Sequence, residues 1–217
     1  MTNRIYNFSA GPATLPLSVL EQAQQELLCY PGAGASLMEI SHRSKTFLAI
    51  LEEAQSNIKT LLGASDDYVV LFTPGGATMQ FTMLAMNFLN GGTADYLHVG
   101  SWAGKAIKDG GRFGTTRKAW SGKDEEFKRM PGDSELDLDS NAAYVHFTSN
   151  ETIQGIQFPK EPDVNGKPLF CDASSDFLCR PTDIGKYAML YAGAQKNVGP
   201  SGTAVVVLHK SMLDRVP

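Results

Sequence analysis

One lysine, Lys196, lies in a stretch of small side chains, YAGAQKNVGPSG (191–202). An apolar run leads into this stretch and a β-branched run follows it, so both flanks are typical of buried strands. Partial burial removes water from an ammonium group, which lowers its pKa and favours the neutral amine that a Schiff base needs. The alternative is an ordinary exposed lysine on a loop.

A second candidate is the Pro-Gly-Gly turn at 74–76, between an apolar run at 68–72 and a helical pattern that starts at Ala77. Free N–H groups at a helix start, together with the helix dipole, bind anions such as phosphate. Glycine lets the backbone approach a ligand closely, and the Thr78 hydroxyl adds a donor. The turn lacks the Gly-Lys-Ser/Thr of a P-loop, and an ordinary strand–helix turn is the alternative.

Two further candidates stand at the ends of apolar strands. Asp172 closes the run PLFCD, and Trp102 follows ADYLHV. In open α/β sheets, ligands bind beyond the carboxyl ends of the strands. A carboxylate there holds a cationic ligand group, and an indole stacks on a flat one. The alternatives are an aspartate that caps a turn and a tryptophan that packs in the core.

Together, these four features match the needs of pyridoxal phosphate. Its phosphate needs helix N–H groups, its ring a stacking partner, its pyridinium nitrogen a carboxylate, and its aldehyde a lysine amine. One connection and one strand separate Asp172 from Lys196, so both side chains can reach a single ring.

The elements that must position these residues form an α/β pattern. Periodicity predicts helices at 17–30, 45–63, 77–90 and 101–110, and strands at 68–72, 94–99, 114–120, 142–147, 168–172, 188–193 and 203–208. A polar stretch at 121–141 predicts a loop with a short helix. A short connection between the last two strands indicates an antiparallel pair. Elsewhere strands alternate with helices, which predicts a mostly parallel, helix-covered sheet with one antiparallel strand.

The length of 217 residues is enough for one large domain or for one and a half average ones. With 42% hydrophobic and 19% charged residues, the composition favours a globular protein with a core. A net charge of −4 without a basic face argues against nucleic-acid binding. No apolar run is long enough to span a membrane. The three cysteines show no metal-site spacing and fit a reducing compartment, and the N-terminus lacks a signal sequence. We therefore expect a cytoplasmic protein without a metal.

Five stretches, in order along the chain, resemble the phosphoserine aminotransferase family, a member of the class V group of fold-type I pyridoxal-phosphate enzymes. They are NFSAGPATLP, MEISHRSK, NETIQGIQF, DASSDFLCRPTDI and YAGAQKNVGPSG. The likeness runs from about Asn7 to Leu208, and the succession of SHR, NETI and GAQKNVG is specific. The resemblance implies an N-terminal arm at 1–15 and the large cofactor-binding domain at 16–217.

The resemblance also implies a role for each site residue. Lys196 forms the Schiff base and is the catalytic residue. The resemblance implies that Gly76, Ala77 and Thr78 form a cradle for the cofactor phosphate and that Gln195 also binds this phosphate. It implies that Trp102 stacks on the cofactor ring and that Asp172 pairs with the ring nitrogen. Thr152 is implied to bond the cofactor on its 3-oxygen side. Substrate binding is implied for His42 and Arg43, with Ser9 near the entrance. Without the resemblance, His42 and Arg43 are simply a surface pair at a helix start.

The family transfers the amino group of glutamate to 3-phosphohydroxypyruvate, giving phosphoserine and 2-oxoglutarate in serine biosynthesis. The resemblance implies this activity and a homodimer. Many family members carry an arginine where Thr78 stands. Family chains are also considerably longer, so a small C-terminal domain, with an arginine that clamps the substrate carboxylate, is expected to be absent from this chain.

The sequence is also compatible with two other functions. One is a different class V reaction, such as cysteine desulfuration or alanine–glyoxylate transamination, which the SHR and NETI motifs argue against. The other is a non-catalytic module that only binds the cofactor or dimerises.

Overall fold

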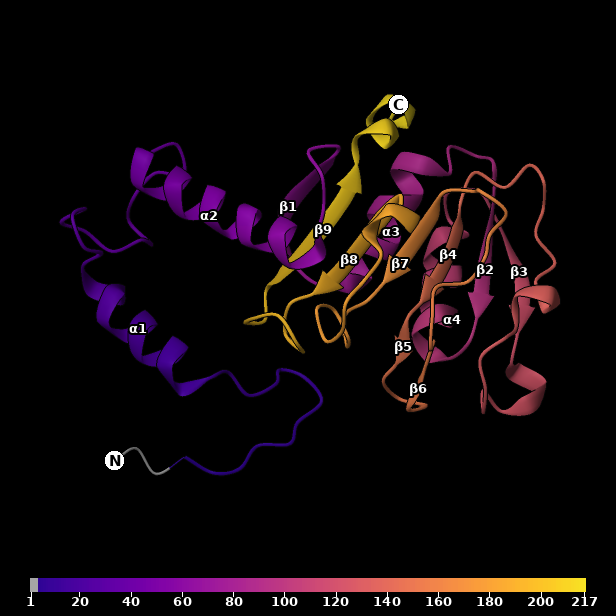
Figure 1. The fold of residues 1–217 in the computed structure, drawn as a ribbon, viewed down its shortest axis with the longest axis horizontal. Helices are drawn as coiled ribbons and strands as arrows, with labels where there is room; N and C mark the ends of the chain where they lie inside the picture. Colours follow the sequence, from indigo (N-terminus) through magenta and orange to yellow (C-terminus); the bar gives the residue numbers. More distant parts are fainter. Residues whose placement is uncertain (1–3) are drawn as a thin grey trace.

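A twisted sheet of seven strands forms the centre of the computed structural model, which describes residues 4–217 (Figure 1). The first three residues of the expected arm lie outside the described residues. In spatial order the strands are β1 (Tyr68–Pro74), β9 (Thr203–His209), β8 (Met189–Gly193), β7 (Leu169–Asp172), β4 (Val145–Thr148), β2 (Thr93–His98) and β3 (Thr115–Ser121). In this sheet β9 runs antiparallel to β1 and β8, and the other neighbouring pairs are parallel. The predicted fold class is confirmed.

The four predicted helices are present. They are α1 (Leu17–Leu28), α2 (Lys45–Leu62), α3 (Ala77–Phe88) and α4 (Ser101–Gly110). The Ser44 side chain caps α2 by accepting the Phe47 N–H, and Gly63 ends that helix in a left-handed conformation with φ 62°. Within residues 4–217, every helix is too short or too polar to cross a bilayer.

Shorter elements complete the chain. They are the hairpin strands β5 (Asn150–Glu151) and β6 (Ile156–Gln157) and the 3₁₀ turns η1 (Lys123–Glu125), η2 (Asp133–Glu135), η3 (Ile184–Lys186) and η4 (Lys210–Arg215). Strand β4 begins at Val145, later than the predicted 142. The residues before it join β2 only through single backbone bonds, such as that from Asp95 N to Tyr144 O, at 3.1 Å.

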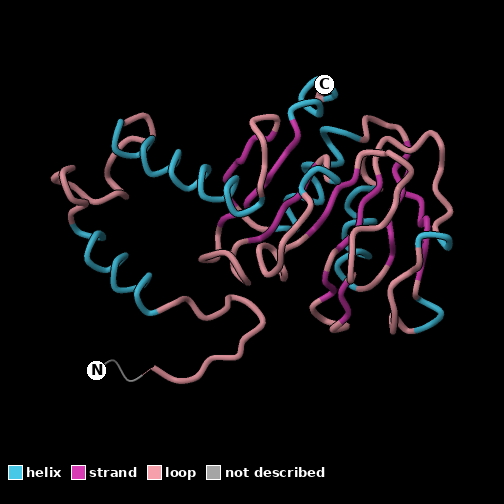
Figure 2. The backbone as a smooth tube through the Cα atoms, in the orientation of Figure 1, coloured by secondary structure: helices cyan, strands magenta, loops and turns pink. Residues whose placement is uncertain are grey.

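The two faces of the sheet are covered differently. Helices α3 and α4 pack on one face, over a core that includes Phe81, Tyr96 and Tyr191. The C-terminal half of α2 and the segments 158–164 and 177–187, on either side of β7, cover the other face. The connections from β4 to β7 and from β7 to β8 contain no α-helix, unlike the expected alternation of strands with helices. Figure 2 shows that most of the chain between these strands is loop. Prolines in these connections disfavour helices because proline lacks an N–H and clashes with the preceding turn.

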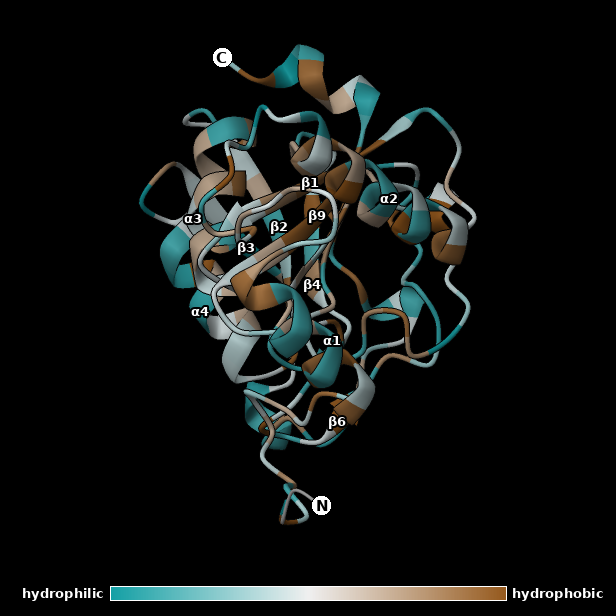
Figure 3. Cartoon of the chain, turned by 90° about the vertical axis from the view of Figure 1, so that its left-hand side faces the viewer, coloured by the Kyte–Doolittle hydropathy of each residue, from teal (hydrophilic) through white to brown (hydrophobic). Residues whose placement is uncertain are grey.

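Helix α1 has no buried residue. Figure 1 shows it apart from the sheet, and Figure 3 shows apolar residues interspersed with polar ones along it. Its exposed apolar side chains are Leu17, Val19, Leu20, Leu27 and Leu28. The amphipathic pattern therefore predicts the helix correctly, but its apolar face contacts no core within the described chain. Several exposed apolar side chains on one helix are typical of a contact surface.

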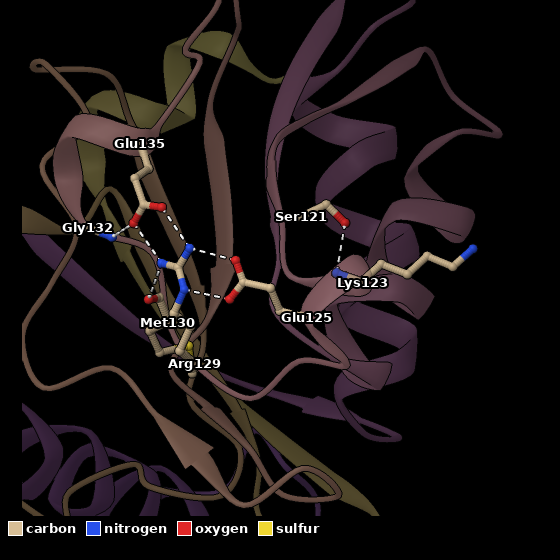
Figure 4. Close-up of polar contacts among 7 residues, drawn as sticks. All are labelled: Ser121, Lys123, Glu125, Arg129, Met130, Gly132 and Glu135. Atoms are coloured by element: carbon tan, nitrogen blue, oxygen red, sulfur yellow. Dashed lines mark hydrogen bonds and ion pairs between the residues drawn. The ribbon is translucent and has the colours of Figure 1, made fainter.

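The polar stretch after β3 is organised by Arg129 (Figure 4). Its guanidinium donates two hydrogen bonds to Glu125 in η1, at 2.6 and 2.8 Å, and two to Glu135 in η2, each at 2.8 Å. The Glu135 carboxylate also accepts the Gly132 N–H at 2.7 Å. The Arg129 guanidinium thus links the two 3₁₀ turns η1 and η2. The sequence predicts a loop with one short helix in this stretch.

Two buried tyrosines allow a stability prediction. The hydroxyls of Tyr96 and Tyr144 bond each other at 2.8 Å, and both side chains are at most 1% exposed. Tyr96→Phe leaves the Tyr144 hydroxyl without this partner, so we expect unfolding free energy to fall by about 1–3 kcal/mol. Replacing both tyrosines by phenylalanine should recover most of the loss. Urea unfolding followed by circular dichroism measures both, and a double variant as unstable as the single one would contradict the argument.

Candidate active site

A cavity of about 220 Å³ lies where the parallel strands end. We call it the site cavity. All eight residues predicted to contact a cofactor line it, namely Gly76, Ala77, Thr78, Trp102, Thr152, Asp172, Gln195 and Lys196. Four lining residues were not predicted, namely Thr148, Asn150, Ser174 and Ser175. The sheet therefore brings together side chains that are far apart in sequence.

A larger cavity, of about 850 Å³, lies at the opposite edge of the sheet, where β7 and β8 begin. Its lining is charged, and two acidic–basic pairs there form ion pairs within the chain. Lys160 contacts Asp133 at 2.8 Å, and Lys186 contacts Glu161 at 3.4 Å. We therefore place the candidate active site in the smaller cavity, where the groups capable of chemistry gather.

Lys196 projects from the connection between β8 and β9. Its Nζ donates to Thr152 Oγ1 at 2.5 Å and lies 5.1 Å from the centroid of the Trp102 ring. Partial burial lowers the pKa of Lys196, and the carboxylates of Asp172 and Glu151 oppose that shift. The amine is thus shifted toward the neutral, nucleophilic form, as the small residues around it suggest.

Asp172, at the end of β7, is held by Ser174. Its Oδ1 accepts both the Ser174 N–H at 3.0 Å and the Ser174 hydroxyl at 2.6 Å. The Ser174 oxygen in turn accepts the Gly193 N–H at 2.9 Å. Burial raises the pKa of Asp172, and the Ser174 bonds oppose it. Because both bonds go to Oδ1, Oδ2 is left for a ligand. An aspartate bonding the N–H two residues on is an Asx turn, which was the available sequence signal for Ser174.

The start of α3 is open. Its N-cap, Gly76, provides no side-chain cap, in contrast to Ser44 on α2. The end of β8 approaches this turn so closely that a Cβ at Gly193 would lie 3.2 Å from Ala77 N and 2.7 Å from Gln195 Oε1. Because no side chain caps this helix, the Ala77 and Thr78 amides are available to bind an anion in the site cavity, whereas the next amide, Met79 N, donates to Gly76 O at 3.0 Å.

Three buried polar atoms around the site cavity have no hydrogen-bond partner in the described chain. They are Trp102 Nε1, Thr148 Oγ1 and Gln195 Oε1. Buried polar atoms are normally paired, so these three indicate a site built for a polar ligand. An amide cradle, an unshared carboxylate oxygen and an amine in the same cavity fit the phosphate, ring nitrogen and aldehyde of pyridoxal phosphate.

The predicted substrate residues lie outside this group. Ser9, His42 and Arg43 are exposed and do not line the site cavity. The N-terminal segment does reach a lining residue of the site cavity, because Ala13 N donates to Gln195 O at 2.7 Å. The roles of Ser9, His42 and Arg43 stay predictions.

The fold is that of a known enzyme class. The family profile described as Aminotransferase class-V matches residues 5–217, and the chain belongs to this family.

Within this class, the chain is similar to proteins named phosphoserine aminotransferase. One from Rhodopirellula baltica is 51% identical over 98% of this chain and 57% of its own length. A solved structure from Bacillus circulans subsp. alkalophilus is 48% identical with a TM-score of 0.95, covering all of this chain and 60% of that one. A PLP-bound structure from Trichomonas vaginalis is 38% identical with a TM-score of 0.91, covering 99% and 61%. The chain thus spans about 60% of the length of such relatives.

Proposed function

We propose that the protein is a pyridoxal-phosphate-dependent aminotransferase that moves the amino group of glutamate to 3-phosphohydroxypyruvate, yielding 2-oxoglutarate and phosphoserine for serine biosynthesis. The observation that supports this most is the convergence of the Lys196 amine, the Asp172 carboxylate and the open start of α3 on one cavity. The choice of substrates rests on the similarity to phosphoserine aminotransferases.

Each residue has a defined task in this proposal. When bound, the cofactor supplies a ring that accepts electrons from the substrate Cα and carries the amino group between the two substrates. Lys196 Nζ would hold the cofactor through its aldehyde carbon. Once the amino group of the substrate has replaced Nζ at that carbon, the freed neutral amine would take the proton from the substrate Cα as a general base. Asp172 Oδ2 holds the ring nitrogen in its protonated state.

The remaining contacts orient the cofactor. Trp102 stacks on its ring, and the Thr152 hydroxyl binds on its 3-oxygen side. The phosphate is bound by the Gly76, Ala77 and Thr78 amides and by Gln195. The anionic groups of the substrate are assigned to His42 and Arg43, with Ser9 near the entrance.

We further propose a cytoplasmic homodimer. The exposed apolar face of α1 supports an assembly, because the described chain leaves it uncovered. All three cysteines are free, in keeping with a reducing compartment. Sedimentation equilibrium measures the mass in solution, and a monomer at micromolar concentration would contradict the dimer.

The pKa of Lys196 gives a pH prediction. Burial of the amine lowers this pKa, and the nearby carboxylates of Asp172, Glu151 and Asp176 oppose the shift only in part, so the pKa lies below 10.5. Because the neutral amine is the reacting form, capture of the cofactor by the cofactor-free protein should rise with pH through a midpoint below 10.5. Stopped-flow absorbance at several pH values measures the midpoint. A midpoint at or above that of an unperturbed lysine would refute this assignment.

Turnover tests the proposal directly. The protein loaded with pyridoxal phosphate is given either glutamate with the phosphorylated keto acid or alanine with glyoxylate. The keto acid released from the donor, 2-oxoglutarate or pyruvate, is measured. Formation of 2-oxoglutarate from glutamate and the phosphorylated acid, without pyruvate from alanine and glyoxylate, supports the proposed reaction. Equal or faster release of pyruvate, or release of sulfide from cysteine, would favour another class V reaction. Cofactor binding without any turnover would favour the non-catalytic module.

A further inference from the structure

The first turn of α4, which carries Trp102, is capped by two side chains from a distant segment. Glu151 Oε2 accepts the Trp102 N–H at 3.0 Å, and Glu151 Oε1 accepts the Ala103 N–H at 2.8 Å. Gln154 accepts the Ser101 N–H at 3.2 Å and donates to the Ser101 hydroxyl at 2.9 Å. The free amides at the start of α4 are therefore satisfied by residues that lie about 50 positions further along the chain.

Glu151 is enclosed at this position. Its side chain is 0% exposed, and both oxygens are engaged by backbone amides at the positive end of the α4 dipole. Space for it depends on Gly100, because a Cβ there would lie 2.5 Å from Glu151 Cδ. A buried carboxylate is costly unless it is bonded in this way. Because Glu151 bonds the backbone of the first turn of α4, it constrains the direction in which the Trp102 side chain projects from this helix.

The turn that begins at Glu151 also contacts the amine of Lys196. Glu151 ends β5, and its carbonyl accepts the Gly155 N–H at 2.8 Å, which closes the turn around Thr152. The Thr152 hydroxyl accepts from Lys196 Nζ. One turn therefore contacts the backbone of Trp102 through Glu151 and the lysine through the adjacent residue.

We propose that Glu151 is a positioning residue that fixes the Trp102 indole in the site cavity by capping α4, and that it holds this ring in register with Thr152 and Lys196. This inference rests on the proposed function, because it assigns Trp102 to the cofactor ring. Glu151 itself contacts no substrate in this account.

Glu151→Gln tests the proposal with little change in size. The introduced amide nitrogen is a donor, so it cannot accept the second N–H, and one of the two bonds to α4 is lost. In the cofactor-free protein, hydrogen–deuterium exchange of the peptide spanning 101–106 should become about tenfold faster. With cofactor, the dissociation constant should rise about tenfold, and the visible circular dichroism of the bound chromophore should weaken.

Glu135→Gln is the matched control, because that carboxylate also accepts a backbone N–H, from Gly132, but lies away from the site cavity. It should leave exchange at 101–106 and the chromophore signal unchanged.

If Glu151→Gln accelerates exchange throughout the protein, Gly100→Ala gives a second test, since its methyl group displaces the Glu151 carboxylate without removing it. It should accelerate exchange at 101–106 alone.

Unchanged exchange at 101–106 in both Glu151→Gln and Gly100→Ala would overturn the proposal. Faster exchange with unchanged cofactor affinity and dichroism would overturn the link to Trp102 positioning. Failure of the unaltered protein to bind pyridoxal phosphate would instead contradict the proposed function, while the exchange data would still decide whether Glu151 holds the start of α4.

Discussion

Lys196→Ala should lower the transamination rate by at least about 10⁴-fold, the upper end of what a positioned acid–base group contributes. The variant loses both the covalent bond to the cofactor and the base at Cα. The methyl side chain leaves the rest of the site cavity intact, so non-covalent cofactor binding through the α3 amides should remain. Steady-state release of 2-oxoglutarate, measured with a coupled dehydrogenase, gives the rate.

Lys108→Ala is the control for Lys196→Ala. Lys108 is an exposed lysine of α4 that does not line the site cavity. It should keep the rate of the unaltered protein. Added primary amines should partly restore activity to Lys196→Ala, because they replace the missing base. A Lys196→Ala variant within tenfold of the unaltered rate would contradict the role of this amine.

Asp172→Asn should lower the rate by about 10²–10³-fold, as expected for removal of one preorganised electrostatic contact. Ser174 donates two hydrogen bonds to Oδ1, so the introduced amide should keep its oxygen on that side and turn its nitrogen toward the site cavity. A donor there cannot accept the proton of the ring nitrogen, which favours the uncharged ring and weakens it as an electron acceptor.

The affinity for the cofactor should fall in Asp172→Asn by about tenfold or more, because a charge-assisted hydrogen bond is lost. Covalent capture by Lys196 should persist, which separates this variant from Lys196→Ala. Absorbance titration gives the affinity, and single-turnover kinetics with glutamate give the rate. Unchanged kinetics at saturating cofactor would show that Asp172 does not hold the ring nitrogen.

The positions of Lys196, Asp172 and Trp102 follow from the sequence because each comes at the end of an apolar strand. Parallel strands place such ends at one edge of the sheet, so strand periodicity alone is sufficient to predict their convergence. Gly76 to Thr78 follow for the same reason, since a strand–turn–helix unit has few possible geometries. These residues depend on local pattern and on topology, both of which are readable without coordinates.

Glu151 and Ser174 were not predicted because their roles depend on tertiary contacts. Nothing in NETIQ indicates that its glutamate caps a helix about 50 residues earlier. A glutamate close to an apolar strand suggests a carboxylate that needs a bonding partner, since fully buried carboxylates occur almost only when they are bonded. The sequence does not indicate which partner that is.

The apolar face of α1 shows that a correctly predicted helix can still have an unpredicted environment. Its periodicity predicts a helix correctly but does not say what covers it. Within residues 4–217 it stays uncovered, so burial cannot be inferred from pattern alone. Helices were also expected between β4 and β8, where proline-containing loops cross the sheet.

The most direct measurement maps where the cofactor is attached. The protein is saturated with pyridoxal phosphate, treated with borohydride, digested and analysed by tandem mass spectrometry. We predict that the added mass falls on Lys196 alone and is lost when that residue is changed to alanine. A stable label on any other lysine, or none on the unaltered chain despite bound cofactor, would contradict the account.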